Sequence, residues 1–237
     1  MAPCATCLIN TLPWMADDRS DMSANQPGAR QPYVTYGLIA ACVAVAIISS
    51  LGKDLQVLTW LTFADLREFD GSIQGGLAAL QHGQVWRLFT PILIHFGIMH
   101  LVLNLLWLKD LGGLIERRWS PRTLVLLVAV SAAASNIAQY LINWDFRDGI
   151  GYANALSGGM SGVVYCLLGY VWIRGRKDGS GVRLNQQTVW MMLGWLVVCF
   201  TGAFGPIANT AHLVGLLVGM GWGWVAAQRV ARHATAE

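Results

Sequence analysis

Long apolar segments, separated by shorter polar ones, occupy most of the chain after residue 33. A helix that crosses a hydrocarbon layer of about 30 Å needs about 20 mostly apolar residues. On this criterion we predict six membrane-crossing helices, at residues 34–51, 96–115, 124–142, 161–173, 188–200 and 210–227. The fourth and fifth segments are short, which is typical of helices that end inside the membrane against protein or water.

The composition favours the same fold class. Of the 237 residues, 55% are hydrophobic and only 12% are charged, and the mean hydropathy is +0.48. A soluble domain carries roughly 25% charged residues. Most of the charged residues of this chain lie between the apolar segments rather than inside them. We therefore predict an all-α integral membrane protein that is surrounded by the lipid bilayer.

The polar stretches divide the chain further. Residues 1–33 predict a flexible cytoplasmic N-terminal tail, residues 34–228 the six-helix domain, and residues 229–237 a cytoplasmic C-terminal tail. Residues 52–94, between the first two helices, mix charges with apolar runs that are too short to span a membrane. This pattern predicts a long loop that dips partly into the membrane.

Lysine and arginine residues indicate the orientation, because they gather on the cytoplasmic side of membrane proteins. With the N-terminus inside, 12 of the 16 lie on the inner side, and the outer side holds only Lys53, Arg67, Arg87 and Arg147. Both termini are therefore predicted to be cytoplasmic. A transit-peptide composition is not evident, which favours a bacterial inner (plasma) membrane. The formal charge of +3 is too small to predict a nucleic-acid partner.

The chain has five cysteines, Cys4, Cys7, Cys42, Cys166 and Cys199. The last three fall inside predicted helices, where a buried thiol behaves as a small hydrophobic group. Cys4 and Cys7 form a CxxC pair, but two thiols alone do not complete a tetrahedral zinc site. We predict no disulfide and no bound metal.

Polar residues inside membrane helices are costly and usually have a function. Ser161 begins the fourth predicted helix, His212 lies near the start of the sixth, and His100 and Asn104 lie in the outer half of the second. At 1.5 Å per residue, Ser161, His212 and His100 each lie roughly 20–25 Å from the arginines that end their own segments. This common depth predicts that the residues share one site.

Small residues predict which helices pack together. The sixth segment carries a stripe at four-residue intervals, made of Ala211, Gly215, Gly219 and Gly223. Such stripes allow two membrane helices to approach closely. Gly158, Gly159 and Gly162 leave space around Ser161, so the fourth helix is the expected partner.

Together these residues predict nucleophilic catalysis. A serine hydroxyl becomes a nucleophile when an imidazole lies within hydrogen-bond reach, as His212 would. The outer halves of the predicted helices contain no Asp or Glu, so a dyad is favoured over a triad. His100 and Asn104 are spaced i, i+4 and share a helix face, from which they could stabilise an oxyanion with the backbone N–H of Ser161.

Three sequence motifs resemble those of the bacterial rhomboid intramembrane proteases. They are HFGIMHLVLN at 95–104, GMSG at 159–162 and ANTAH at 208–212, and a Trp86-Arg87 pair precedes the first. The resemblance covers roughly residues 34–227 and implies a six-helix rhomboid bundle without cofactor or metal. The implied substrates are transmembrane segments of other proteins that partly unwind, with a small residue before the cleaved bond.

The resemblance also implies a role for each site residue. Ser161 would be the nucleophile and His212 the general base, and His100 and Asn104 would stabilise the oxyanion. Tyr165 would pack on His212, and residues 201–207 would form a mobile cap over the site. The residues expected to support the site are Tyr165, Gly159, Gly162, His95 and Gly215.

Three other interpretations compete with a serine protease. A non-catalytic relative that binds transmembrane helices would be expected to lack Ser161 or His212. A small transporter would need aqueous access from both sides, whereas the polar residues lie only in the outer half. A metalloprotease built on His95, His100 and His212 would lack a carboxylate ligand in the membrane, and the chain contains no HExxH motif.

Overall fold

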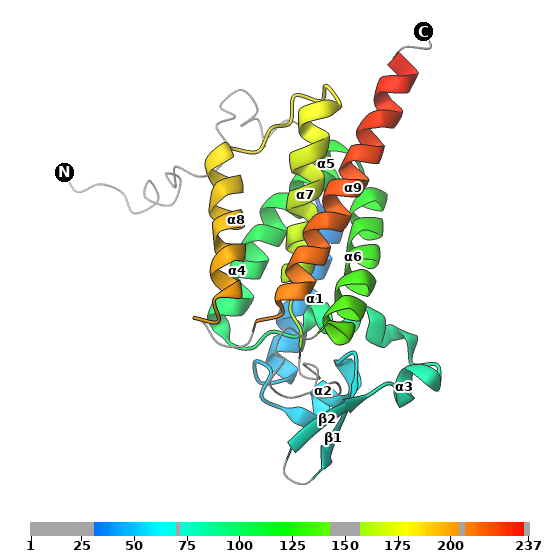
Figure 1. Cartoon of the computed structure of the whole chain (residues 1–237), viewed down its shortest axis with the longest axis vertical. Helices are drawn as coiled ribbons and strands as arrows, with labels where there is room; N and C mark the ends of the chain where they lie inside the picture. Colours follow the sequence, from blue (N-terminus) through cyan, green and yellow to red (C-terminus); the bar gives the residue numbers. More distant parts are fainter. Residues whose placement is uncertain (1–30, 70–71, 143–156, 204–206, 235–237) are drawn as a thin grey trace, which may run out of the picture.

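The computed structural model describes residues 31–69, 72–142, 157–203 and 207–234, and most of them are helical. Figure 1 shows a bundle of roughly parallel helices above a smaller part that contains two strands. The main helices of the bundle are α1 (Tyr33–Ile48), α4 (Ile98–Trp107), α5 (Gly113–Arg118), α6 (Pro121–Leu141), α7 (Ser161–Lys177), α8 (Gln186–Phe200) and α9 (Asn209–Ala234).

Each predicted apolar segment coincides with helix in the structure. The π-helical turn η4 (Leu108–Gly112) joins α4 to α5, so these three form one continuous helical segment. Within the described residues, three helical segments are long and apolar enough to cross a membrane: Ile98–Arg118, Pro121–Leu141 and Asn209–Arg232. The helix α9 continues to Ala234, well into the residues predicted as a C-terminal tail.

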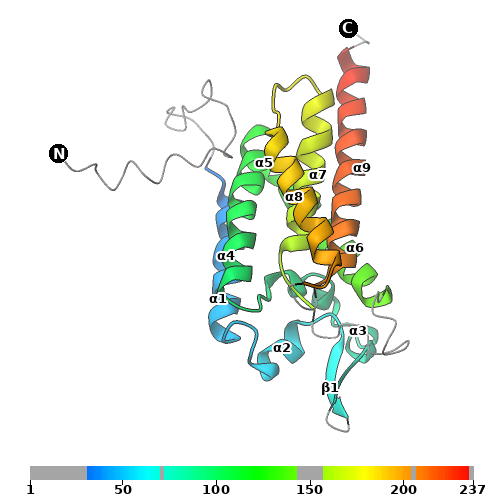
Figure 2. The same ribbon diagram turned by 60° about the vertical axis from the view of Figure 1, so that its left-hand side comes forward.

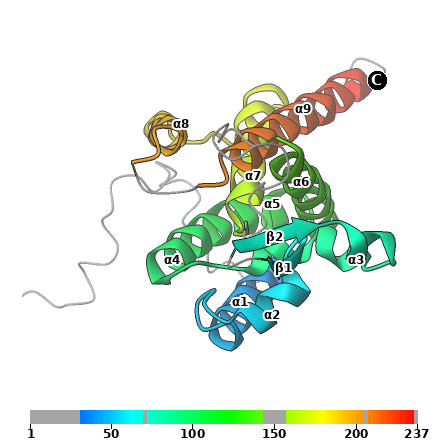
Figure 3. The same cartoon turned by 60° about the horizontal axis from the view of Figure 1, so that its bottom comes forward.

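The helix α7 occupies the middle of the bundle (Figure 3). Every residue from Gly162 to Val171 is buried, so α7 is covered by protein on all sides over this stretch. A helix that is apolar all round is expected in such a position. The helix α8 stands at the edge of the bundle and exposes Trp190 and Val197.

The helices α7 and α9 are packed with their backbones in contact, as the glycine stripe predicts. A Cβ added at Gly215 would overlap the carbonyl oxygen of Gly162, and one added at Gly219 would overlap that of Cys166. At Gly223 the added Cβ would lie 2.7 Å from the carbonyl oxygen of Tyr170. The predicted close approach of the fourth and sixth helices is therefore confirmed.

The helix α1 is held by a carboxylate from another helix. Glu116 of α5 is buried and accepts hydrogen bonds from the backbone N–H groups of Val34 and Thr35, both at 2.9 Å, and from the Thr35 hydroxyl at 2.8 Å. The first N–H groups of a helix have no partner within the helix, so this carboxylate supplies the missing cap. It ties the start of α1 to the end of α5.

The connection from α1 to α4 contains secondary structure that the sequence analysis did not predict. It holds α2 (Leu55–Leu61), β1 (Asp65–Phe69), β2 (Ser72–Gly76), α3 (Ala78–Gln81) and the 3₁₀ turns η2 (Val85–Leu88) and η3 (Thr90–Leu93). β1 and β2 pair antiparallel, with Asp65 opposite Gly76 and Phe69 opposite Ser72. The all-α prediction is therefore wrong at this hairpin, because two strands can satisfy each other's backbone groups locally.

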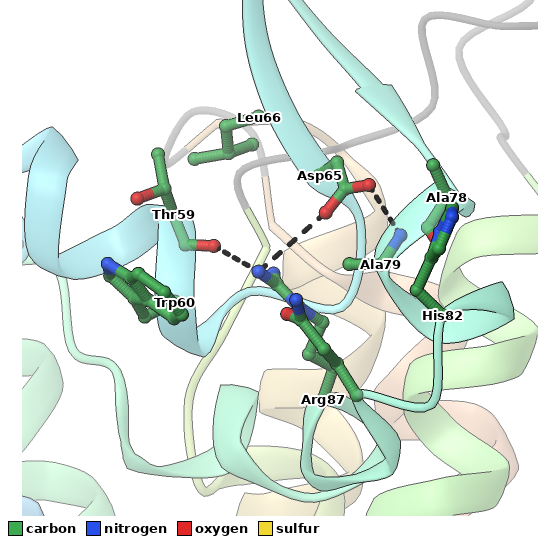
Figure 4. Close-up of a pocket in the computed structure, with 9 residues that line it drawn as sticks. Thr59, Trp60, Asp65, Leu66, Ala78, Ala79, His82 and Arg87 are labelled. Carbon is green, nitrogen blue, oxygen red and sulfur yellow. Dashed lines mark hydrogen bonds and ion pairs between the residues drawn. The ribbon is translucent and has the colours of Figure 1, made fainter.

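Arg87 fastens this connection. Its side chain is only 4% exposed and donates to the carbonyl oxygens of Thr62 at 2.9 Å and Thr59 at 2.6 Å. It also forms an ion pair with Asp65 at 3.7 Å, beside a cavity of about 400 Å³ (Figure 4). Burial lowers the pKa of Arg87, and the charge of Asp65 opposes this shift. Asp65 in turn accepts from the backbone N–H of Ala79 at 2.6 Å, so one arginine links α2, β1 and η2.

Candidate active site

Ser161 and His212 meet where α7 and α9 begin. The Oγ of Ser161 lies 2.7 Å from the Nε2 of His212, which is hydrogen-bond distance. The two residues are 51 positions apart in the chain, and the close α7–α9 packing brings them together. Ser161 is the first residue of α7, so its backbone N–H has no partner within the helix.

His212 is buried and contacts Tyr165, one turn after Ser161. The two ring centroids are 5.1 Å apart at an interplanar angle of 36°. The Tyr165 hydroxyl donates to the carbonyl oxygen of Met192 at 2.9 Å, which connects this ring to α8. Among the described residues, the buried Nδ1 of His212 has no hydrogen-bond partner. The described part of the chain therefore contains a pair, with no third residue hydrogen-bonded to the Nδ1 of the imidazole.

His100 faces the segment that precedes Ser161. Its Nδ1 accepts a hydrogen bond from the backbone N–H of Phe96 at 3.3 Å, which assigns the ring proton to Nε2. Nε2 lies against Gly159, where an added Cβ would be only 2.7 Å away. Gly159 has a φ of +123°, which also favours glycine, so both its conformation and its space suit this residue.

Asn104 lies one turn further along α4 and is buried. Its Nδ2 donates to the carbonyl oxygen of His100 at 2.8 Å, so one of its two N–H groups is used inside its own helix. The second N–H group of the Asn104 carboxamide is not used in this bond. Asn104 and His100 therefore share one face of α4, as their spacing predicts.

His95 is completely buried beside His100, with ring centroids 5.1 Å apart. Its Nδ1 bonds to the carbonyl oxygen of Leu93 at 3.0 Å. The structure thus brings together His95, His100 and Gly159 on one side and Ser161 and His212 on the other.

Within the described ranges, no group of three or more His, Cys, Asp or Glu side chains has the arrangement of a metal site.

Three polar side chains of α6 hold the backbone on both sides of the Ser161–His212 pair. The Ser131 hydroxyl donates to the Gly162 carbonyl at 3.3 Å, and the Ser135 hydroxyl donates to the Ala211 carbonyl at 3.1 Å. Gln139 Oε1 accepts from the backbone N–H of Ala211 at 3.1 Å. The sequence analysis did not identify these three residues. Ser131, Ser135 and Gln139 are spaced i, i+4, i+8 and therefore share one face of α6, and this pattern could have identified them as a polar face toward the site.

Residues next to His212 tie α9 to its surroundings. Asn209 Nδ2 donates to the carbonyl oxygen of Cys199 at 3.2 Å, and the Thr210 hydroxyl donates to that of Ile142 at 3.1 Å. Residues 204–206 of the predicted cap lie outside the described residues, as do Cys4 and Cys7. Cys42, Cys166 and Cys199 are free and buried.

Comparison with known proteins gives the family. The Rhomboid domain matches residues 82–229, which include all the residues of the pair and its surroundings. This chain belongs to the rhomboid family. It is 37% identical over 194 residues to a protein named Rhomboid protease GlpG from Salmonella paratyphi A and 35% identical over 193 residues to one of that name from Klebsiella pneumoniae. Each match covers 81% of this chain.

The chain spans about 62% of the length of these curated relatives. The Rhomboid match at residues 82–229 contains η2, η3, α4 to α8 and most of α9. Membership of the family, together with the three long apolar helices, makes this rhomboid protein an integral membrane protein.

Proposed function

We propose that this protein is a serine endopeptidase that cleaves transmembrane segments of other membrane proteins. The observation that carries the proposal is the 2.7 Å contact between Ser161 Oγ and His212 Nε2 at the buried start of two helices. An imidazole at this distance is positioned to accept the serine proton. The relatives named Rhomboid protease GlpG support the same activity.

In the proposed reaction, Ser161 Oγ attacks the carbonyl carbon of the scissile peptide while His212 Nε2 takes the hydroxyl proton. The tetrahedral intermediate collapses when His212 returns the proton to the leaving amine, which departs and leaves an acyl ester on Ser161. A water molecule, deprotonated by His212, then attacks the ester carbonyl; as the ester bond breaks, His212 gives the proton to Ser161 Oγ and the acid is released. Tyr165 packs against the imidazole and restricts its orientation throughout.

The negative oxygen of the tetrahedral intermediate needs hydrogen-bond donors. The backbone N–H of Ser161 and the partial positive charge at the start of α7 are the nearest to the attacked carbon. His100 supports this role because its Nε2 carries the proton and lies against Gly159. Asn104 contributes its second N–H group. His95 and the glycines Gly159, Gly162 and Gly215 act by packing these groups together.

We further propose that six helical segments cross the membrane, namely α1, α4–α5, α6, α7, α8 and α9. Their shared direction in Figures 1 and 2 supports this arrangement, and so do the apolar side chains that they expose. The connection from α2 to η3 would lie partly in the outer interface, beside the site. In this arrangement the N-terminal region and the C-terminus are in the cytoplasm of a bacterium, and α9 leads out of the bundle.

The substrate is proposed to be a transmembrane helix that unwinds locally. A helix hides its carbonyl groups in internal hydrogen bonds, so the scissile carbonyl is accessible only after these bonds break. The α8 edge and residues 201–207 are the proposed entry route, since α8 lies at the margin of the bundle (Figure 3).

The proposal is tested with purified full-length protein and a tagged transmembrane substrate in detergent or vesicles. Wild type should cleave it, while Ser161→Ala and His212→Ala should each lower the rate by about 10⁴-fold or more, because the nucleophile or its base is lost. Cys42→Ser, which replaces a buried thiol of α1 by a hydroxyl, is the matched control and should cleave normally.

Cleavage that persists in Ser161→Ala would disprove the mechanism. A folded wild type that binds but cleaves none of several transmembrane substrates would instead support a non-catalytic helix-binding protein. Measuring substrate binding beside cleavage separates these two outcomes.

A further inference from the structure

A second cavity lies between α6, α7 and α9, at the opposite end of α7 from Ser161. Its volume is about 630 Å³, within the range of about 300–1,000 Å³ that is usual for small-molecule sites. Figure 1 shows α9 running past the start of α6 at this end of the bundle. The proposed protease mechanism does not use this cavity.

The cavity is a groove that follows α9. The residues that α9 contributes run from Val218 to Val230 at intervals of three and four, so they occupy one face of the helix. At 1.5 Å per residue this face is about 18 Å long. One leaflet of a hydrocarbon layer is about 15 Å thick, so the groove has roughly the length of a lipid chain in one leaflet.

The polarity of the groove changes along its length. Its deeper part is apolar, with Leu126 of α6 opposite Val218 and Trp222 of α9 in the lining. The other end carries the guanidinium groups of Arg174 and Arg229. An apolar channel that ends in positive charge matches a phospholipid with a negatively charged head group.

The two arginines differ in how they are held. Arg174 is fixed, since its Nε donates to Asp178 at 2.9 Å and its guanidinium lies 4.7 Å from the centroid of the Trp119 ring. Arg229 is exposed, and no carboxylate of the described residues forms an ion pair with it. With Asp178 as the carboxylate beside Arg174, the described groups at this end carry a net positive charge.

We propose that this groove binds one anionic phospholipid from the leaflet on the arginine side. One acyl chain would lie against Leu126, Val218 and Trp222. The phosphate would lie between Arg174 and Arg229, since arginine N–H groups bond well to phosphate oxygens. The net charge selects an anionic lipid over a zwitterionic one, because the ammonium group of the latter would face two arginines.

The proposal is tested on the full-length protein in mixed micelles by native mass spectrometry, which counts bound lipids. Wild type should bind phosphatidylglycerol more tightly than phosphatidylcholine of the same chains. Arg229→Gln should weaken phosphatidylglycerol binding by about fivefold, the effect expected of one arginine near a membrane surface. Arg183→Gln removes a charge from the loop after α7, outside the groove, and is the matched control that should leave binding unchanged.

A second pair of variants tests the chain-binding part without altering charge. A Cβ added at Gly221 meets no atom within 4 Å, so Gly221→Leu fits the fold and fills space in the groove. It should reduce phosphatidylglycerol binding several-fold. Gly194→Leu of α8, where an added Cβ also meets no atom within 4 Å, should leave binding unchanged.

Each outcome decides the proposal. Equal binding of the two lipids by wild type would overturn it. So would equal losses in Arg229→Gln and Arg183→Gln, or unaltered binding in Gly221→Leu. Glycerol phosphate, which has the charge but no chains, should not displace the lipid; displacement at matched concentration would indicate a site for free phosphate instead. None of these readouts depends on proteolysis.

Discussion

The short Ser161–His212 distance depends on residues that take no part in the proposed chemistry. Ser131, Ser135 and Gln139 hold the carbonyl of Gly162 and both backbone groups of Ala211, which are the immediate neighbours of the pair. Because these bonds are buried in a membrane protein, few water molecules can replace them. The position of each member of the pair is therefore set through its backbone.

The contributions of His100 and Asn104 to oxyanion stabilisation can be measured separately by replacing one residue at a time. His100→Ala should lower kcat by about 10²-fold, the usual effect of removing one oxyanion donor. Asn104→Ala should lower it less, because one of its N–H groups already bonds to the His100 carbonyl. Steady-state cleavage assays check both. Complete loss in both variants, together with a lower melting temperature, would point to collapse of the fold instead.

Asp178, just after α7, gives a pH-dependent prediction. Burial raises the pKa of its carboxyl, but hydrogen bonds from Ser180, Arg174 and Trp119 outweigh burial and lower it overall. A carboxyl with a lowered pKa in the folded state stabilises the fold above its unfolded pKa of about 3.9. This stabilisation is lost as the pH falls through the folded pKa.

Asp178→Asn should therefore destabilise the protein at pH 7 by about 1.5–3 kcal/mol, the range for hydrogen bonds to a charged group. The difference from wild type should shrink below about pH 4. Thermal unfolding in detergent, followed by tryptophan fluorescence across this pH range, measures it. A difference that stays constant down to pH 2 would contradict the assignment.

At the scale of elements, the α7–α9 contact is the most demanding feature of the bundle. It requires glycine at Gly215, Gly219 and Gly223, because carbonyl groups of α7 occupy the space that side chains would need. The same packing carries His212 to Ser161. The stability of these two helices and the geometry of the site therefore depend on the same residues.

Gly215→Val should lower activity at least tenfold and reduce stability by about 2 kcal/mol or more, since overpacking forces the helices apart. Gly37→Val of α1 is the matched control, because Gly37 is exposed and an added Cβ there meets no atom within 4 Å. Unfolding and cleavage assays compare the two variants. Equal behaviour of both would show that close packing is not needed.

The whole molecule is polarised from one end to the other. The strands β1 and β2 and the first turns of α7 and α9, which carry Ser161 and His212, lie toward one end, while α1 begins and α9 ends toward the other (Figures 1 and 2). The positively charged Arg174 and Arg229 lie toward the end where α9 finishes. This polarity sets how the protein is expected to sit in a membrane.

Topology can be tested by cysteine labelling in intact cells. In a background with Cys4 and Cys7 replaced by serine, His82→Cys should react with an impermeant maleimide, because His82 is exposed in the connection that is proposed to face outside. Arg183→Cys should react only after lysis, because Arg183 is exposed in the loop after α7, which is proposed to face the cytoplasm. The reverse pattern would invert the proposed orientation.

Local patterns were sufficient to predict most of the helices. Apolar length and polar flanks placed all six helical segments, and each boundary except the end of α9 lies within four residues of the structure. Counting residues along each helix also predicted that Ser161, His212 and His100 lie at one level, and the Ser161–His212 and His100–Gly159 contacts agree with this. These properties are determined locally, because a helix satisfies its backbone groups within itself.

Contacts between distant segments were decided only by the tertiary structure. The sequence suggested that Ser161 and His212 share a depth, but the 2.7 Å distance depends on glycine packing and on three polar groups of α6. The β1–β2 hairpin, the Arg87 contacts and the groove beside Arg229 likewise join residues far apart in the chain. No local pattern encodes such pairings, since they arise from how side chains of several helices fill one another's space.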